Sequence, residues 1–209
     1  MTKSEIRSFV KGLVRGISVE ERTRFSEALK EEVVGLECWR SAKEVMLFFS
    51  LPDEVDMLPL IRAALAEQKR IYLPRVIATQ VSRGVDVCKV AEGNTLPAGN
   101  TVSGEEMILE VRELAPEQLA PGRWGIWEPT DEAPLLSDYS RLDLVVVPGV
   151  AFSSDGKRLG RGKSFYDRFL PLVPRAAFVG VCYPCQVVEQ IPADPWDIGM
   201  DIVCCGKKR

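Results

Sequence analysis

Histidine is absent from this chain of 209 residues. It is the usual general base of enzymes, the partner of the nucleophile in Ser/His and Cys/His arrangements, and the commonest zinc ligand. Its absence excludes those catalytic arrangements. Any chemistry must rely on carboxylates, lysines, arginines, backbone amides or a metal ion. Phosphoryl transfer fits this set, because it depends mainly on positioning and charge neutralisation.

Three further features are missing. No apolar run approaches the ~20 residues of a membrane span. The charged N-terminal segment, residues 1–7, lacks the apolar stretch of a secretory signal peptide. An excess of basic residues is also missing, since the net charge is −3, whereas nucleic-acid-binding domains are usually basic. We therefore expect a cytoplasmic monomer that binds small molecules and neither membranes nor nucleic acid.

The six cysteines raise the question of a zinc or redox site. Cys182 and Cys185 form a C-x-x-C pair, and Cys204 and Cys205 are adjacent. Adjacent residues of a strand point to opposite faces, so the second pair is poorly placed to hold one ion. Reduced, buried thiols that act as small apolar side chains are the favoured interpretation, and zinc is the alternative.

The apolar pattern predicts an α/β fold. Helical spacing predicts helices over residues 3–15, 18–38, 58–68 and 164–172, and short apolar runs predict strands over residues 45–49, 71–74, 107–111, 142–147, 176–182 and 201–205. Such alternation indicates a single domain, residues 1–209, with an open, mainly parallel (mixed) sheet and helices on both faces, a Rossmann-like three-layer arrangement. Residues 115–140 are predicted to be rich in loops. Residues of about 79–103, rich in glycine and asparagine, are predicted to be a loop or hairpin insertion.

Ligands of such sheets bind at the carboxyl ends of the strands, which singles out residues 50–56 and 148–163. The second loop leads into residues 156–170, GKRLGRGKSFYDRFL. Gly162-Lys163-Ser164 resembles the end of a P-loop, but Gly156 lies one position too early. The predicted strand also ends about nine residues before Gly156. The segment is therefore not a P-loop.

The same segment still has the composition of an anion site. It contains four cations within seven residues: Lys157, Arg158, Arg161 and Lys163. Glycines allow backbone amides to approach a ligand, and a helix beginning near Ser164 attracts phosphate at its N-terminus. Asp167 follows as a candidate Mg²⁺ ligand. The alternative is a solvated basic loop.

Residues 142–170, LDLVVVPGVAFSSDGKRLGRGKSFYDRFL, resemble the signature of the 5-formyltetrahydrofolate cyclo-ligase family. Further matches follow in order at residues 3–7 (KSEIR), 49–56 (FSLPDEVD), 72–75 (YLPR) and 125–129 (GIWEP), and at Gln186, Ile191, Pro192, Trp196, Asp197 and Asp201. Among the departures from the family pattern is Ser164, where the family usually has glycine. Serine there strains the loop if the backbone needs a positive φ, or else caps the helix.

The resemblance implies that 5-formyltetrahydrofolate and ATP react, with Mg²⁺, to give 5,10-methenyltetrahydrofolate, ADP and phosphate. It implies an ATP site made of Lys3, Ser4, Glu5, Ile6, Arg7, Arg158, Leu159, Gly160, Arg161, Gly162, Lys163, Ser164, Phe165 and Tyr166. Within this site Lys163 and Arg161 are the catalytic candidates. The implied folate site consists of Arg7, Phe49, Glu54 and Tyr166. The implied Mg²⁺ ligands are Asp167 and Asp197.

Each assignment has a plainer alternative. Lys3 and Arg7 share one helix face, which is otherwise a solvated basic face. Asp167 complements a helix dipole, Glu54 and Asp197 are turn residues, and Tyr166 is a core aromatic residue. At the level of the whole protein, the alternatives are a non-catalytic folate- or nucleotide-binding homologue, and a sugar-phosphate isomerase or CoA-handling enzyme on a similar sheet.

Overall fold

The computed structural model describes residues 1–80, 105–122 and 125–207. Within these ranges the main sheet has six strands in the order β11-β9-β6-β1-β2-β3. Their bounds are β1 Glu44–Met46, β2 Arg70–Gln80, β3 Glu105–Glu113, β6 Leu144–Pro148, β9 Ala177–Val181 and β11 Ile202–Cys204. All neighbouring pairs are parallel except β2 and β3, which are antiparallel. The predicted mixed, mainly parallel sheet is confirmed.

Both faces of this sheet are covered, which explains the continuous apolar run of its central strand. In β6, Val146 packs into one core, and Val145 and Val147 pack into the other. All three are fully buried. A strand with a single buried face would instead alternate apolar and polar residues.

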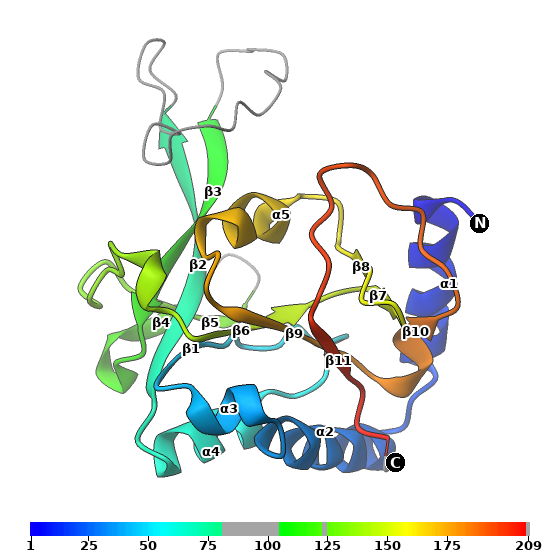
Figure 1. The fold of residues 1–209 in the computed structure, drawn as a ribbon, viewed down its shortest axis with the longest axis horizontal. Coiled ribbons are helices and arrows are strands. Elements are labelled where there is room, and N and C mark those ends of the chain that lie inside the picture. Colours follow the sequence, from blue (N-terminus) through cyan, green and yellow to red (C-terminus); the bar gives the residue numbers. More distant parts are fainter. Residues whose placement is uncertain (81–104, 123–124, 208–209) are drawn as a thin grey trace.

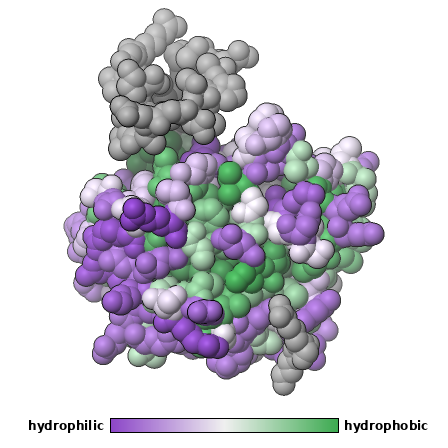
Figure 2. All heavy atoms as spheres, in the orientation of Figure 1, coloured by the Kyte–Doolittle hydropathy of each residue, from purple (hydrophilic) through white to green (hydrophobic). Residues whose placement is uncertain are grey.

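The first face is covered by α1 Lys3–Arg15, α2 Val19–Val34, α3 Glu37–Ser41 and α4 Leu58–Ala66. The second face is covered by α5 Phe165–Phe169 and the 3-10 turn Leu170–Leu172. In Figure 1, α2, α3 and α4 lie below the sheet and α5 lies above it. The prediction of helices on both faces is therefore confirmed. Figure 2 shows apolar residues gathered near the middle of the same view, where Figure 1 places β9 and β11, with hydrophilic residues toward the rim.

Two predicted helices differ from the structure. The helix predicted over residues 18–38 is two helices, because the chain leaves the helix at Gly35 and Leu36 adopts an extended ψ of 146°. The helix predicted over residues 164–172 is the short α5 followed by a 3-10 turn.

The shortest elements were not predicted. β7 Ala151–Ser153, β8 Arg158–Leu159 and β10 Val187–Val188 form a second sheet in the order β10-β7-β8, and β4 Leu119–Pro121 pairs with β5 Trp127–Pro129. Other 3-10 turns lie at Pro116–Gln118, Tyr139–Arg141 and Pro184–Gln186. These strands have two or three residues and, unlike β1 and β11, lie in no apolar run of four or more residues that would predict a buried strand.

The region predicted to be an insertion is flanked by two paired strands. β2 and β3 pair from Tyr72 with Glu113 to Gln80 with Glu105. Residues 79 and 80 of the predicted insertion therefore belong to β2. Residues 81–104 lie outside the described residues, so the loop or hairpin predicted there stays a prediction.

Cys204 and Cys205 face opposite sides of the sheet, as their adjacency in a strand predicts, because Cys204 packs into the first core and Cys205 against the second. Among the described residues there is no group of three or more His, Cys, Asp or Glu side chains arranged to hold a metal ion. The same residues include no helix long and apolar enough to cross a bilayer.

Two glycine-to-alanine substitutions test the packing of this fold and are expected to act in opposite directions. At Gly180 in β9, an added Cβ would lie 2.4 Å from Cε1 of the buried Phe152 ring, so Gly180→Ala should lower the free energy of unfolding by about 1–3 kcal/mol. At Gly12 in α1 an added Cβ meets nothing within 4 Å, so Gly12→Ala should raise that free energy by about 0.5–1 kcal/mol. Urea denaturation measures both. A neutral Gly180→Ala variant would contradict the placement of Phe152 against β9.

Candidate active site

Three loops meet at the carboxyl ends of three adjacent parallel strands, β1, β6 and β9. The loop after β1 carries Asp53 and Glu54. The chain after β6 runs through β7 and β8 into the glycine-rich loop, residues 160–164. The chain after β9 carries Tyr183 and Gln186. Parallel strands end at the same edge of a sheet, which is why these distant segments come together.

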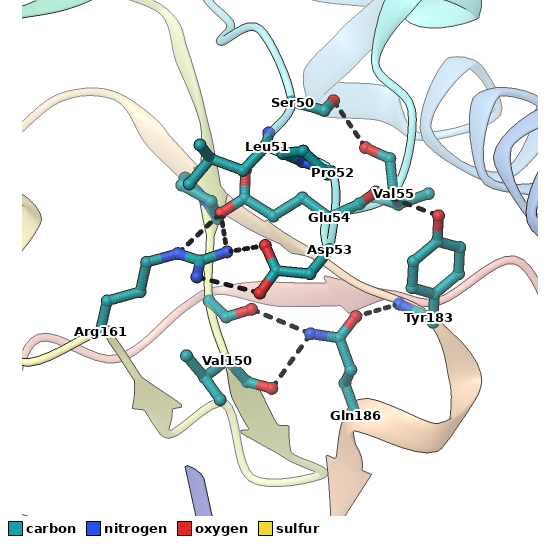
Figure 3. Close-up of polar contacts among 12 residues, drawn as sticks. Ser50, Leu51, Pro52, Asp53, Glu54, Val55, Val150, Arg161, Tyr183 and Gln186 are labelled. Atoms are coloured by element: carbon teal, nitrogen blue, oxygen red, sulfur yellow. Dashed lines mark hydrogen bonds and ion pairs between the residues drawn. The ribbon is translucent and has the colours of Figure 1, made fainter. Parts of the chain in front are cut away.

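Two buried side chains, Gln186 and Tyr183, tie the three loops to one another (Figure 3). Oε1 of Gln186 accepts the Tyr183 N–H at 2.7 Å, and its Nε2 donates to the carbonyls of Gly149 and Val150, both at 3.0 Å. The Tyr183 hydroxyl donates to the carbonyl of Glu54 at 3.0 Å. Because the buried amide is bonded on both sides, it fixes two of the loops without leaving a polar group unsatisfied.

Arg161 connects the glycine-rich loop to the loop after β1 (Figure 3). Its Nη1 and Nη2 bind the two carboxylate oxygens of Asp53 at 3.1 and 2.7 Å. Its Nε and Nη2 also bind Oε1 of Glu54, at 3.2 and 2.9 Å. The hydrogen bonds from Arg161 hold the pKa of Asp53 below its usual value. The structure thus brings a residue expected at ATP into contact with one expected at folate.

Asp53 is a part of this site that sequence reasoning missed. Its only signal is its place beside Glu54 in a polar turn at the end of a strand. Its partner Arg161 is 108 residues away, so their pairing depends on the tertiary fold.

Arg158 lies in β8, just before the glycine-rich loop, and its side chain is buried. Its side chain is 4% exposed, and its Nη2 binds Oδ1 of Asp167 at 2.5 Å. Its guanidinium carbon lies 5.6 Å from the centre of the Tyr166 ring, and its Nη1 reaches the Pro148 carbonyl at 3.4 Å. Its buried Nε has no hydrogen-bond partner among the described residues.

The N-terminal turns of α1 contact the glycine-rich loop and residues 194–197. The Lys3 ammonium binds Oδ2 of Asp194 at 2.7 Å and Oδ2 of Asp197 at 2.5 Å. Nε of Arg7 donates to the carbonyl of Gly160 at 2.8 Å. Both basic residues therefore point into the site, which favours the functional interpretation over a solvated basic face.

Other predicted site residues have structural roles. Glu5 forms a capping box with Thr2, and Ile6 and Leu159 are in the core. Phe49 is half-buried and packs against that core. Ser4 is exposed.

The tip of the loop holds the remaining predicted residues. Lys163 is exposed and has no hydrogen-bond or ion-pair partner within the described part of the chain. Gly162 has a φ of 92°, and Ser164 also has a positive φ, 52°. The Ser164 side chain makes no capping hydrogen bond, so the capping interpretation is wrong and the strain interpretation is supported. Phe165 is half-buried beside Arg168, whose guanidinium carbon lies 5.7 Å from the ring centre.

The two expected Mg²⁺ ligands each bind a cation: Asp167 is bound by Arg158 and Asp197 by Lys3. Each retains one carboxylate oxygen, Oδ2 of Asp167 and Oδ1 of Asp197, that accepts no hydrogen bond from the described residues. Mg²⁺ commonly takes one or two carboxylates and fills its octahedron with phosphate oxygens and water. The donors present therefore fit Mg²⁺ bound together with a phosphate ligand.

The structure defines an α/β protein with a cation-rich site at the carboxyl ends of its parallel strands. The profile of the 5-formyltetrahydrofolate cyclo-ligase family matches residues 1–206, and the chain belongs to that family. This confirms the resemblance carried by residues 142–170.

Individual relatives agree with this assignment. The 5-formyltetrahydrofolate cyclo-ligase of Escherichia coli K12 is 31% identical over 169 residues, covering 80% of each chain. That of Haemophilus influenzae is 26% identical over 206 residues, covering 98% of this chain and 97% of the relative. The solution structure of the Aquifex aeolicus 5,10-methenyltetrahydrofolate synthetase superposes with a TM-score of 0.75 at 33% identity, covering 100% of this chain and 91% of that one.

Replacing Ser164 by glycine should relieve the strain at this position. A non-glycine residue in the left-handed region costs about 1–2 kcal/mol, part of which is offset by the greater entropy of glycine in the unfolded chain. Ser164→Gly should therefore raise the free energy of unfolding by about 0.5–1 kcal/mol in urea denaturation. Ser8→Gly, at an exposed position in the right-handed helix α1, is the control and should lower it by about 0.5 kcal/mol. A loss of stability in Ser164→Gly would contradict the strain.

The Lys3–Asp197 pair should make stability depend on pH. Partial burial disfavours the charged carboxylate, but hydrogen bonds from Lys3 and from the Asp194 N–H outweigh it and hold the pKa of Asp197 below its usual value. The unfolded carboxyl titrates at about 3.9, so this stabilisation is complete above that pH and is lost as the pH falls through the lower folded value. Asp197→Asn should therefore flatten the acid side of the curve of unfolding free energy against pH. Glu117→Gln, an exposed carboxyl in a 3-10 turn, is the control. Curves for Asp197→Asn and the wild type that run parallel below pH 5 would contradict the coupling.

Proposed function

We propose that this protein catalyses the ATP- and Mg²⁺-dependent cyclisation of 5-formyltetrahydrofolate to 5,10-methenyltetrahydrofolate, with release of ADP and phosphate. Family membership supports the activity. The observation that carries the site assignment is the contact of Arg161 with Glu54. One residue is expected to bind the triphosphate and the other the folate, and a phosphoryl group can pass between two substrates only if their sites adjoin.

The reaction proceeds in two steps. A lone pair of the formyl oxygen attacks the γ-phosphorus, and the bond from that phosphorus to the β,γ-bridging oxygen breaks, releasing ADP. N10 of the folate then attacks the activated formyl carbon, the bond from that carbon to the phosphorylated oxygen breaks, and phosphate leaves with the electron pair. N10 loses its proton to solvent. The first step requires charge neutralisation and the second requires a good leaving group, so a chain without histidine can carry out both.

Residues 3–7 and 158–166 form the proposed ATP site. Lys163 is exposed at the tip of the loop and has no competing carboxylate among the described residues, so it is available to the γ-phosphate. Arg161 would also bind the γ-phosphate, after its guanidinium exchanges the Glu54 carboxylate for a phosphate oxygen. Together they would stabilise the negative charge on the transferred group. Lys3 and Arg7 complete the cationic lining from α1.

Glu54 is the proposed anchor of the folate ring. Its side chain is 9% exposed, and its carboxylate can accept hydrogen bonds from the N–H groups of the pterin. Arg7, Phe49 and Tyr166 would surround the rest of the folate.

Asp167 and Asp197 are the proposed carboxylate ligands of Mg²⁺, through the oxygens that remain open. The ion would neutralise charge on the phosphates of ATP. When ATP binds, Lys3 would keep the carboxylate of Asp197 oriented, and Arg158 would keep that of Asp167 oriented. Cytoplasmic location, a monomeric state and a single domain stay predictions from the sequence.

An absorbance assay tests the proposed function. The purified protein, 5-formyltetrahydrofolate and Mg²⁺ should produce the near-ultraviolet absorbance of the methenyl product only when ATP is added. Lys163→Ala should lower kcat by about 100-fold or more, as expected when a group that stabilises developing charge is removed. Lys43→Ala is the matched control, because Lys43 is exposed just before β1, at the opposite end of that strand from the site, and its kcat should stay within about twofold of the wild type.

Four results would contradict the proposal or part of it. Product formation without ATP would exclude phosphorylation of the formyl oxygen. Full activity in Lys163→Ala would remove that residue from catalysis. Binding of both ligands without product would instead indicate a non-catalytic homologue, and binding of phosphorylated sugars alone would indicate an isomerase-like enzyme.

A further inference from the structure

Asp53 lies at the centre of the site but has no role in the reaction described above. It occupies the two Nη groups of Arg161 in a fork, the geometry in which a carboxylate orients a guanidinium most firmly. Glu54, its neighbour, binds the same guanidinium through Nε and Nη2. One cation is thus shared between two carboxylates.

The hydrogen bonds of Glu54 limit how folate can enter. A carboxylate offers about four lone-pair sites. Oε1 already accepts two hydrogen bonds from Arg161, and Oε2 accepts the Leu51 N–H at 3.0 Å. A pterin that presents two N–H groups needs two sites. Folate must therefore displace at least one of these three contacts, and the two from Arg161 are side-chain contacts that can exchange, whereas the Leu51 N–H belongs to the backbone of the loop.

The backbone of this loop is held in place while the side chains exchange partners. The Tyr183 hydroxyl binds the carbonyl of Glu54, and Nη1 of Arg22 donates to the carbonyl of Pro52 at 3.2 Å. The loop that carries Glu54 therefore stays in place, and the exchange takes place between side chains. A guanidinium released by Glu54 would be left without its second partner unless another group holds it.

Resting on the proposed function above, we infer that Asp53 is a positioning residue for the reaction. It shares Arg161 with Glu54. When folate binds Glu54, Asp53 still holds the guanidinium of Arg161 beside the phosphates. The two carboxylates differ in a way that suits this division. The side chain of Glu54 is 9% exposed, as befits a partner for an uncharged ring, whereas that of Asp53 is 34% exposed.

Removal of the charge on Asp53 should affect the two ligands in opposite directions. Without it, Arg161 binds Glu54 alone, and folate must compete harder for Glu54. At the same time the triphosphate competes with one carboxylate fewer for Arg161. Folate binding therefore weakens while nucleotide binding tightens. A role for Asp53 in merely supporting the loop would weaken both.

Isothermal titration calorimetry tests this inference on the whole protein. The two probes are 5-formyltetrahydrofolate, and a non-hydrolysable ATP analogue with Mg²⁺, each titrated separately. For Asp53→Asn, the Kd of folate should rise about 3–10-fold and the Kd of the ATP analogue should fall about 3–10-fold, the range expected for one partly exposed charge. Asp53→Glu keeps the charge and should return both values toward those of the wild type. If Asp53→Asn does not fold, Asp53→Ser repeats the test.

Asp131→Asn is the matched control. Asp131 also binds an arginine, Arg75, at 2.7 Å, but on the antiparallel side of the sheet, and both Kd values should stay at the wild-type level. Weaker binding of both ligands in Asp53→Asn, or no change in either, would overturn the inference and leave the proposed function intact. A wild-type protein that binds neither ligand would overturn both.

Discussion

The parallel pairing of β6 with β1 on one side and β9 on the other is the constraint on which the site depends. Val45 of β1 pairs with Leu144 of β6, and Leu144 pairs with Ala177 of β9. The three strands are therefore in register. Their carboxyl ends then release three loops at one edge. Gln186 joins the chain after β9 to the chain after β6, and Tyr183 joins it to the loop after β1. Both bonds form because the strands bring Gly149, Val150 and Glu54 within reach.

Within this frame, cations and carboxylates are paired across the loops. Lys3 binds Asp194 and Asp197, Arg158 binds Asp167, and Arg161 binds Asp53 and Glu54. Buried ion pairs contribute little net stability after desolvation, but an unpaired buried charge is costly. The pairs therefore keep the cations oriented in the free protein. An incoming phosphate replaces one anion by another, so binding requires an exchange of partners and no new burial of charge.

The parts of this arrangement that could be predicted from the sequence are those with a local signal. The apolar run of β6, the helical spacing of apolar residues in α1, and the glycine-rich motif all lie within a short stretch of sequence. β7, β8 and β10 were missed because they lie in no apolar run of four or more residues, so only their pairing in the fold reveals them. Asp53 was missed because its meaning comes from Arg161, which only the fold brings near. At Ser164 the sequence left strain and capping open, and the φ of 52° decided between them.

The most direct test of this account is a crystal structure of the protein with 5-formyltetrahydrofolate and a non-hydrolysable ATP analogue. We predict that the Glu54 carboxylate binds the folate ring, that Arg161 keeps Asp53 while turning from Glu54 toward the phosphates, and that Lys163 lies at the γ-phosphate. A complex in which folate is bound while Arg161 still holds Glu54 through both nitrogens, or in which the triphosphate lies away from residues 158–164, would contradict this prediction.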